Sequence, residues 1–189
     1  MTGAPLQILT ISGSLQERSA NTALVRAAQR VAPAGLGLVV HPSLADMPLL
    51  NPDLDGEGDA APEPVRRLRA AFASADGVLL ATPEYGHSMP GLLKNALDWL
   101  VQSGELSGMR VGLMSASPTM GGGIGAQMAL TRTLMAQAAL VAVSLTVPGV
   151  KAKLDEHGEL AHAPTLRRVS ETLVALGEAA EERRAWLAA

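Results

Sequence analysis

Short apolar runs alternate with longer amphipathic stretches along the chain. The runs predict five β-strands, at Leu6–Ser12, Leu36–His41, Gly77–Thr82, Arg110–Ser115 and Val141–Val147. The stretches between them have apolar residues at helical spacing and predict helices that begin near Asn21, Pro64, Pro90, Ile124 and Pro164. Because every run is apolar on both faces, we expect a parallel sheet covered by helices on both sides, with right-handed crossovers. The pattern therefore predicts an α/β fold, a single three-layer domain over residues 1–189.

Composition narrows the class of protein. Hydrophobic residues make up 48% and charged residues 17% of the chain. This gives enough apolar surface for the chain to fold without disulfides or structural metal ions. The absence of cysteine excludes disulfides, thiolate catalysis and cysteine-ligated metals, and suits a reducing compartment. A net charge of -3 gives no sign of a basic surface that would bind nucleic acid or an acidic membrane. No apolar run approaches the roughly 20 residues of a membrane span, and no signal peptide is recognisable, so we expect a cytoplasmic protein.

The loop after the first strand has the composition of a phosphate site. In a parallel sheet, ligands bind beyond the carboxyl ends of the strands. Residues 12–21 (SGSLQERSAN) combine three hydroxyls, an amide, an arginine and a glycine just before a helix. The unpaired N–H groups and the dipole of a helix N-terminus favour an anion there. The alternative is simple N-capping by Ser19 or Asn21, which would leave Arg18 and the other hydroxyls unexplained.

The loop after the third strand, residues 82–91 (TPEYGHSMPG), holds the only tyrosine of the chain. Tyr85 could fill the core, but an aromatic residue between two prolines beyond a strand end is better placed to contact a ligand ring. Glu84 and His87 suggest acid–base chemistry or a metal site. No further ligand stands at metal-binding spacing, so we expect both as solvated side chains and predict no metal.

The loop after the fourth strand is rich in glycine. Residues 121–126 (GGGIGA) match the dinucleotide fingerprint Gly-x-Gly-x-x-Ala, which leaves a nicotinamide dehydrogenase as an alternative. That motif requires an acidic residue about 20 positions on, and the fifth strand carries none. We expect instead that the glycines let the backbone lie close to a flat ring.

Two motifs together resemble the NADPH-dependent FMN reductase family: GSLxxxSxN over residues 13–21 and TPEYxxSxPGxLKNxxDW over residues 82–99. The segment PSLADMPL, residues 42–49, is also similar to the family's segment after its second strand. The resemblance implies a flavodoxin-like fold with strand order 2-1-3-4-5 and a single FMN-binding domain.

The resemblance also implies roles for individual residues. The family commonly has arginine where this chain has Gln16, and we expect Arg18 to supply the missing charge. Gly86 stands where the family often has asparagine. Around the FMN phosphate the candidates are Ser14, Gln16, Arg18, Ser19 and Asn21; around the flavin ring they are Pro83, Glu84, Tyr85, Gly86 and Ser117.

The resemblance implies a ping-pong reaction: we expect a hydride to pass from NADPH or NADH to flavin N5, and an acceptor such as a quinone, free flavin, azo compound or chromate then to take the electrons. The cofactor carries this chemistry, so we expect no catalytic side chain. The alternative is a non-enzymatic flavodoxin-like electron carrier. Such a carrier typically needs an acidic face for docking, and a net charge of -3 is weak support for one. A plain interaction domain would leave the three loops unexplained. The family also implies a homodimer or homotetramer, with Trp99 as an interface candidate.

Overall fold

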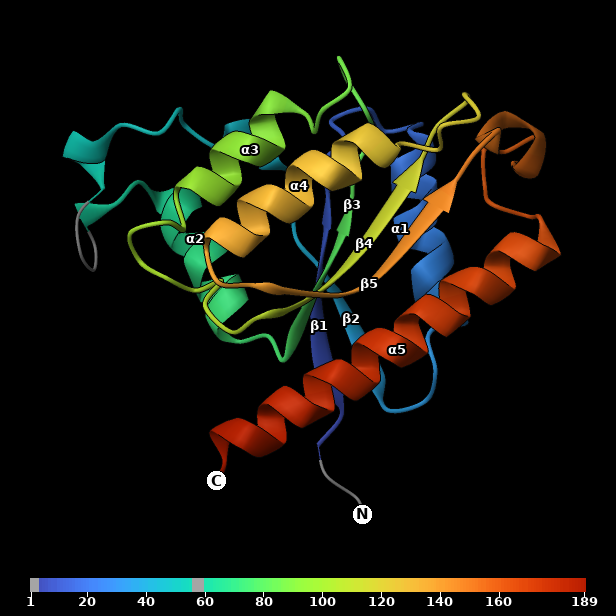
Figure 1. Cartoon of the computed structure of the whole chain (residues 1–189). Helices are drawn as coiled ribbons and strands as arrows, with labels where there is room; N and C mark the ends of the chain where they lie inside the picture. Colours follow the sequence, from blue (N-terminus) through green and yellow to red (C-terminus); the bar gives the residue numbers. More distant parts are fainter. Residues whose placement is uncertain (1–3, 56–59) are drawn as a thin grey trace.

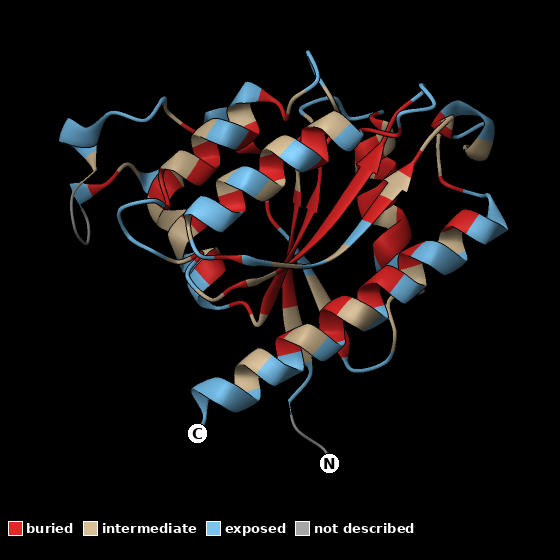
Figure 2. Ribbon diagram, in the orientation of Figure 1, coloured by how far each residue is buried: buried red, intermediate tan, exposed pale blue. Residues whose placement is uncertain are grey.

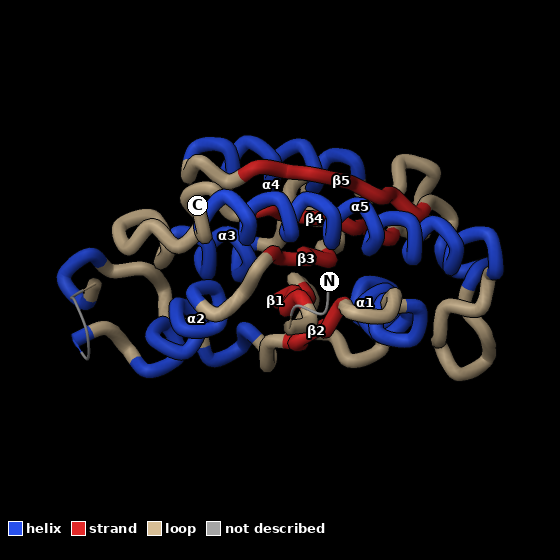
Figure 3. The backbone as a smooth tube through the Cα atoms, turned by 90° about the horizontal axis from the view of Figure 1, so that it is seen from below, coloured by secondary structure: helices blue, strands red, loops and turns tan. Residues whose placement is uncertain are grey.

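Five parallel strands form one sheet, in a computed structural model that describes residues 4–55 and 60–189. Figure 3 shows the strands stacked in the order β2-β1-β3-β4-β5, which confirms the predicted order. Each strand boundary lies within one residue of its predicted position. The strands are β1 (Leu6–Ser12), β2 (Leu36–Val40), β3 (Gly77–Ala81), β4 (Arg110–Ala116) and β5 (Leu140–Val147).

Helices cover both faces of the sheet, as predicted (Figure 1). Alternate residues of β1 divide between the two layers: Ile8 packs with α1 and α5, whereas Leu9 and Ile11 pack with α2, α3 and α4. This period-2 alternation makes two apolar cores from strands that are apolar on both faces. The helices are α1 (Ala20–Val31), α2 (Glu63–Ala73), α3 (Gly91–Asp98), α4 (Ile124–Ala136) and α5 (Ala163–Leu187).

The two edge strands are less buried than their sequences predict (Figure 2). Every residue of β3 is buried, but Val39 of β2 and Leu140 of β5 are about half exposed. The helices cover only part of each edge, so the carboxyl half of β5 is buried at Leu145 and Val147 while its beginning is not. The predicted cover on both faces of the sheet therefore holds, but it leaves parts of the two edge strands exposed.

Helix α3 holds the long connection between β2 and α2. Trp99, just after the helix, is fully buried and its Nε1 donates to the carbonyl oxygen of Pro48 at 2.8 Å. The Asn95 side chain donates to the same carbonyl and accepts from the backbone N–H of Leu50, both at 2.8 Å. Trp99 is thus a core residue with a satisfied N–H, and its prediction as an interface residue is wrong.

Candidate functional site

A cleft of about 490 Å³ lies at the carboxyl end of the sheet, between the loops that follow β1, β3 and β4 and the segment that follows β5. Its volume is in the range of small-molecule sites, roughly 300–1,000 Å³. Eight of the ten predicted site residues line it, while Ser14 and Gly86 do not: the eight are Gln16, Arg18, Ser19, Asn21, Pro83, Glu84, Tyr85 and Ser117.

The β1–α1 loop offers unpaired N–H groups at the start of α1. Ser19 is the N-cap of α1, and its side chain accepts from the N–H of Asn21 at 3.1 Å, so the capping expected as an alternative does occur. Several other backbone N–H groups of this loop have no such partner among the described residues. Within residues 4–55 and 60–189, no acceptor faces the backbone N–H groups of Leu15, Glu17, Arg18 and Ala20. Such a set at a helix N-terminus favours an anion.

Asn21 connects α1 to the end of β4. Its side chain is 2% exposed; the amide nitrogen donates to the carbonyl of Ala116 at 3.1 Å and the amide oxygen accepts from the N–H of Ala116 at 2.9 Å. The sequence predicts a ligand contact for Asn21, and the structure shows that both polar atoms of its amide already hold the loop in position.

Arg18 and Ser14 differ in their surroundings. The Arg18 side chain is exposed and forms no hydrogen bond or ion pair with any residue that the structure describes. Ser14 is half-buried, and its hydroxyl accepts from the backbone N–H of Gln16 at 3.3 Å. Arg18 is therefore the available cation of this loop, whereas Ser14 holds the loop's shape.

The β3–α3 loop presents Tyr85 on a tight turn. Tyr85 and Ser88 exchange both backbone hydrogen bonds, at 2.9 and 3.0 Å, and the two residues between them have positive φ, +56° at Gly86 and +60° at His87. This is the combination of a type I′ turn, in which glycine and asparagine are favoured. Tyr85 is 59% exposed, which excludes a core-filling role and leaves its ring at the rim of the cleft.

Glu84 is not the solvated side chain that the sequence predicts. It is 21% exposed, and its Oε2 accepts from the N–H of Ala126 in the first turn of α4, at 3.2 Å. The N-cap residue of α4, Gly123, has no side chain for this task. The other carboxylate oxygen of Glu84 lies 3.3 Å from Nδ1 of His87, whose side chain is almost fully exposed, as predicted. Glu84 thus anchors the Tyr85 turn to α4.

Contacts within the fold account for two of the glycines after β4. Gly122 and Gly123 have φ of +61° and +88°, and a Cβ on Gly123 would lie 2.7 Å from the Cβ of Ser115. The loop therefore lies against its own strand, which by itself requires glycine at these two positions; that the loop also lies close to a flat ring stays a prediction. None of residues 121–126 lines the cleft, so nothing favours the dehydrogenase alternative.

Sequence reasoning missed the segment after β5. Val150, Lys151 and Leu154 line the cleft, the first two from the short helix η4 (Val150–Lys153). The rule that ligands bind beyond the carboxyl ends of parallel strands applies to β5 as well, and that signal could have found the segment.

Clusters of metal ligands and membrane-spanning helices are both absent from the part of the chain that the structure describes. Among residues 4–55 and 60–189, no three histidine, aspartate or glutamate side chains come together as a possible metal site. In the same part of the chain, every helix is too short or too polar to span a bilayer.

Residues 6–152 match the family described as NADPH-dependent FMN reductase. The chain belongs to this family. Family membership confirms the resemblance and identifies the chain as an NAD(P)H-dependent flavin oxidoreductase with FMN as cofactor.

Relatives and solved structures agree with the family. A quinone reductase of Escherichia coli K12 is 35% identical over 178 residues, which cover 92% of this chain and 94% of the relative. An NAD(P)H-dependent FMN reductase of Pseudomonas aeruginosa PAO1 is 37% identical over 132 residues, 69% of this chain and 70% of the relative. A flavoenzyme NAD(P)H:acceptor oxidoreductase from Paracoccus denitrificans superimposes with a TM-score of 0.79 at 25% identity, covering 94% of this chain and 98% of that one.

Proposed function

We propose that the cleft at the carboxyl end of the sheet binds FMN and that the protein reduces small quinones with NAD(P)H. The observation that carries the proposal is the convergence, on one cleft of suitable volume, of unpaired N–H groups, a free guanidinium and an exposed aromatic ring. These are the contacts that a phosphorylated, flat cofactor requires.

The phosphate would lie at the β1–α1 loop. The N–H groups of this loop and the hydroxyl of Ser19 are neutral donors, and Arg18 adds a positive charge beside them. A guanidinium suits phosphate because it forms charge-assisted hydrogen bonds in a planar pair. Gln16 can donate a hydrogen bond but cannot neutralise charge, so we assign the charge-pairing role to Arg18.

The flavin ring would lie between the β3–α3 and β4–α4 loops. Pro83 and Tyr85 line the cleft on one side, and Ser117 lines it from the end of β4. Because Glu84 and the turn at residues 85–88 are held by backbone hydrogen bonds, the ring-binding wall is organised before any ligand enters.

The chemistry that FMN supplies when bound is two-electron transfer between NAD(P)H and the acceptor. The protein's own residues have to bind and orient, and no side chain of the cleft is needed to move a proton in the hydride step. We therefore propose no catalytic residue. NAD(P)H and the acceptor would reach the same open rim, beside Tyr85, one after the other.

The quinone as acceptor is proposed from the relatives. The names of several relatives state quinone reduction, including a 2-hydroxy-1,4-benzoquinone reductase of a Burkholderia species, 40% identical over 94 residues. Free flavin, azo compounds and chromate stay as candidate acceptors from the family.

We also propose a homodimer or homotetramer in the cytoplasm. The support for assembly is an apolar row on α4, in which Ile124, Met128 and Met135 are each more than half exposed. An exposed row of this kind is typical of a protein interface. The cysteine-free composition suits a reducing compartment.

Steady-state kinetics test the activity. With NADPH and 1,4-benzoquinone varied together, a ping-pong enzyme gives parallel lines in a double-reciprocal plot and many turnovers per protein. Oxidation of no more than one NADPH per bound FMN would contradict the proposal and favour the electron carrier.

A further inference from the structure

The cleft contains a second cation that no motif indicates. Lys151 and Arg18 are the cations among its lining residues, and Glu84 is the carboxylate. Glu84 is held by α4, whereas Lys151 is exposed and has no hydrogen-bond or ion-pair partner within residues 4–55 and 60–189. An unpaired lysine in the wall of a cleft is available to a bound anion.

The backbone around Lys151 is fixed to the loop after β4. The N–H of Gly149 donates to the carbonyl of Thr119 at 3.2 Å, and the N–H of Val150 donates to that of Ser117 at 3.1 Å. Val150 itself is 2% exposed. The position from which Lys151 extends is therefore set by the same loop that forms one wall of the cleft.

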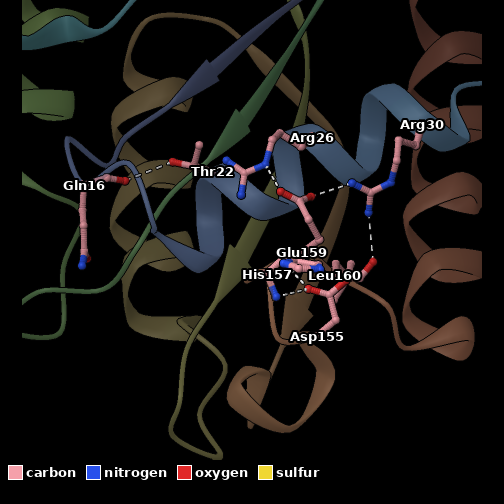
Figure 4. Close-up of polar contacts among 8 residues, drawn as sticks. All are labelled: Gln16, Thr22, Arg26, Arg30, Asp155, His157, Glu159 and Leu160. Carbon is pink, nitrogen blue, oxygen red and sulfur yellow. Dashed lines mark hydrogen bonds and ion pairs between the residues drawn. The ribbon is translucent and has the colours of Figure 1, made fainter.

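Glu159 and Leu160, further along the chain from Lys151, are held against α1 (Figure 4). Glu159 accepts from Arg26 at 2.5 Å and from Arg30 at 2.6 Å, and Arg30 also donates to the carbonyl of Leu160 at 2.9 Å. Burial raises the pKa of Glu159, but the hydrogen bonds and charges of the two arginines outweigh burial and leave that pKa below its usual value. The residues that follow Lys151 are thus tied to α1, the helix whose first turn is the expected phosphate site.

We propose that Lys151 is a second cationic ligand of the FMN phosphate, reaching it from the segment that follows β5. The inference rests on the proposed function. At neutral pH a phosphate monoester carries a charge of about −1.5 to −2, which a single arginine does not balance. Lys151 supplies the second charge in a chain whose Gln16 is neutral, and Glu159 keeps the segment that carries Lys151 in place.

The test compares the affinities of FMN and riboflavin, which differ only in the phosphate. Apoprotein is titrated with each flavin by fluorescence quenching, for the wild type and for Lys151→Gln, Lys151→Arg and Lys153→Gln. Lys153 is the matched control, because it lies two residues away, does not line the cleft, and binds the carbonyl of Pro148.

We expect Lys151→Gln to weaken FMN binding about tenfold, as the loss of one charge-assisted contact does, and to leave riboflavin binding within about twofold. Lys151→Arg should restore most of the FMN affinity, and Lys153→Gln should bind both flavins like the wild type.

Three results would overturn the inference. An equal loss for FMN and riboflavin would mean that Lys151 contacts the ring or merely supports the fold. Unchanged FMN binding, with a KM for NADPH raised relative to that for NADH, would assign Lys151 to the 2′-phosphate of the dinucleotide. Equal losses in Lys151→Gln and Lys153→Gln would indicate a general charge effect. A wild-type protein that binds neither flavin would instead refute the proposed function.

Discussion

Replacing Asn21 by alanine removes both hydrogen bonds that join the start of α1 to Ala116 at the end of β4. Asn21 is 2% exposed and Ala116 4%, so water has little access to replace the lost partner. The substitution therefore separates the structural role of Asn21 from the ligand contact that its sequence position suggests.

The expected loss of stability follows from these contacts. Two buried hydrogen bonds contribute about 1 kcal/mol each, and leaving their backbone partners unsatisfied adds to the cost, for a total of about 2–4 kcal/mol. In a chain of this length, 1 kcal/mol corresponds to roughly 3 °C in Tm, so Asn21→Ala should lower the Tm by roughly 6–12 °C. Asn21→Asp should also destabilise at pH 7, because a carboxylate cannot donate to the carbonyl of Ala116.

Differential scanning calorimetry of the apoprotein measures this effect. Asn51→Ala is the matched control, because Asn51 is exposed and, among the residues that the structure describes, its side chain makes one hydrogen bond, which it accepts from the N–H of Asp53. It should cost at most about 1 kcal/mol. If Asn21→Ala keeps the wild-type Tm and only weakens FMN binding, the structural role argued here is refuted.

Three further predictions concern the phosphate loop, the turn after β4 and the ion pairs of α1. Arg18→Gln should weaken FMN binding about tenfold while riboflavin binding stays within about twofold, measured by fluorescence titration. Gly123→Ala should lower the free energy of unfolding by more than about 2 kcal/mol in a urea titration, because φ is +88° and the new Cβ would lie 2.7 Å from a strand side chain. Glu159→Gln should cost about 1 kcal/mol at pH 7. Because the folded-state pKa of Glu159 lies below its ordinary value of 4.5, this difference from the wild type should be present above pH 4.5 and close as the pH falls below it.

Each of these predictions has a control. Leu15→Ala changes an exposed side chain of the same loop and should not discriminate between the two flavins. Gly158→Ala also has positive φ but no atom within 4 Å of the new Cβ, so a loss equal to that of Gly123→Ala would contradict the steric argument. For Glu159→Gln, a stability difference that persists unchanged at pH 3 would show that the ion pairs are not its cause.

The strands and the three polar loops that follow β1, β3 and β4 were predictable because the local sequence pattern determines them. A run such as Leu6–Ser12 is apolar on both faces, as a central strand of a covered sheet requires. The parallel arrangement then brings the loops after separate strands to one edge of the sheet. Tyr85 could be assigned to the rim because its turn and its flanking prolines are local signals.

The errors concern residues whose roles depend on distant contacts. Glu84 receives a hydrogen bond from Ala126, 42 positions away, and Trp99 donates to Pro48, 51 positions away. Neither partner is visible in a local pattern. The contact of Gly123 with its own strand was also not predictable, because a glycine-rich loop looks the same whether its backbone lies against a cofactor or against a strand. Lys151 carries no motif, and only the folded chain places it in the cleft.

The most direct test of the central claim is the visible spectrum of the protein, incubated with FMN, desalted, and recorded before and after anaerobic addition of NADPH. An FMN-binding oxidoreductase retains the flavin absorption band through desalting, and NADPH bleaches it. Loss of the band on desalting, or a retained band that neither NADPH nor NADH bleaches, would contradict the account.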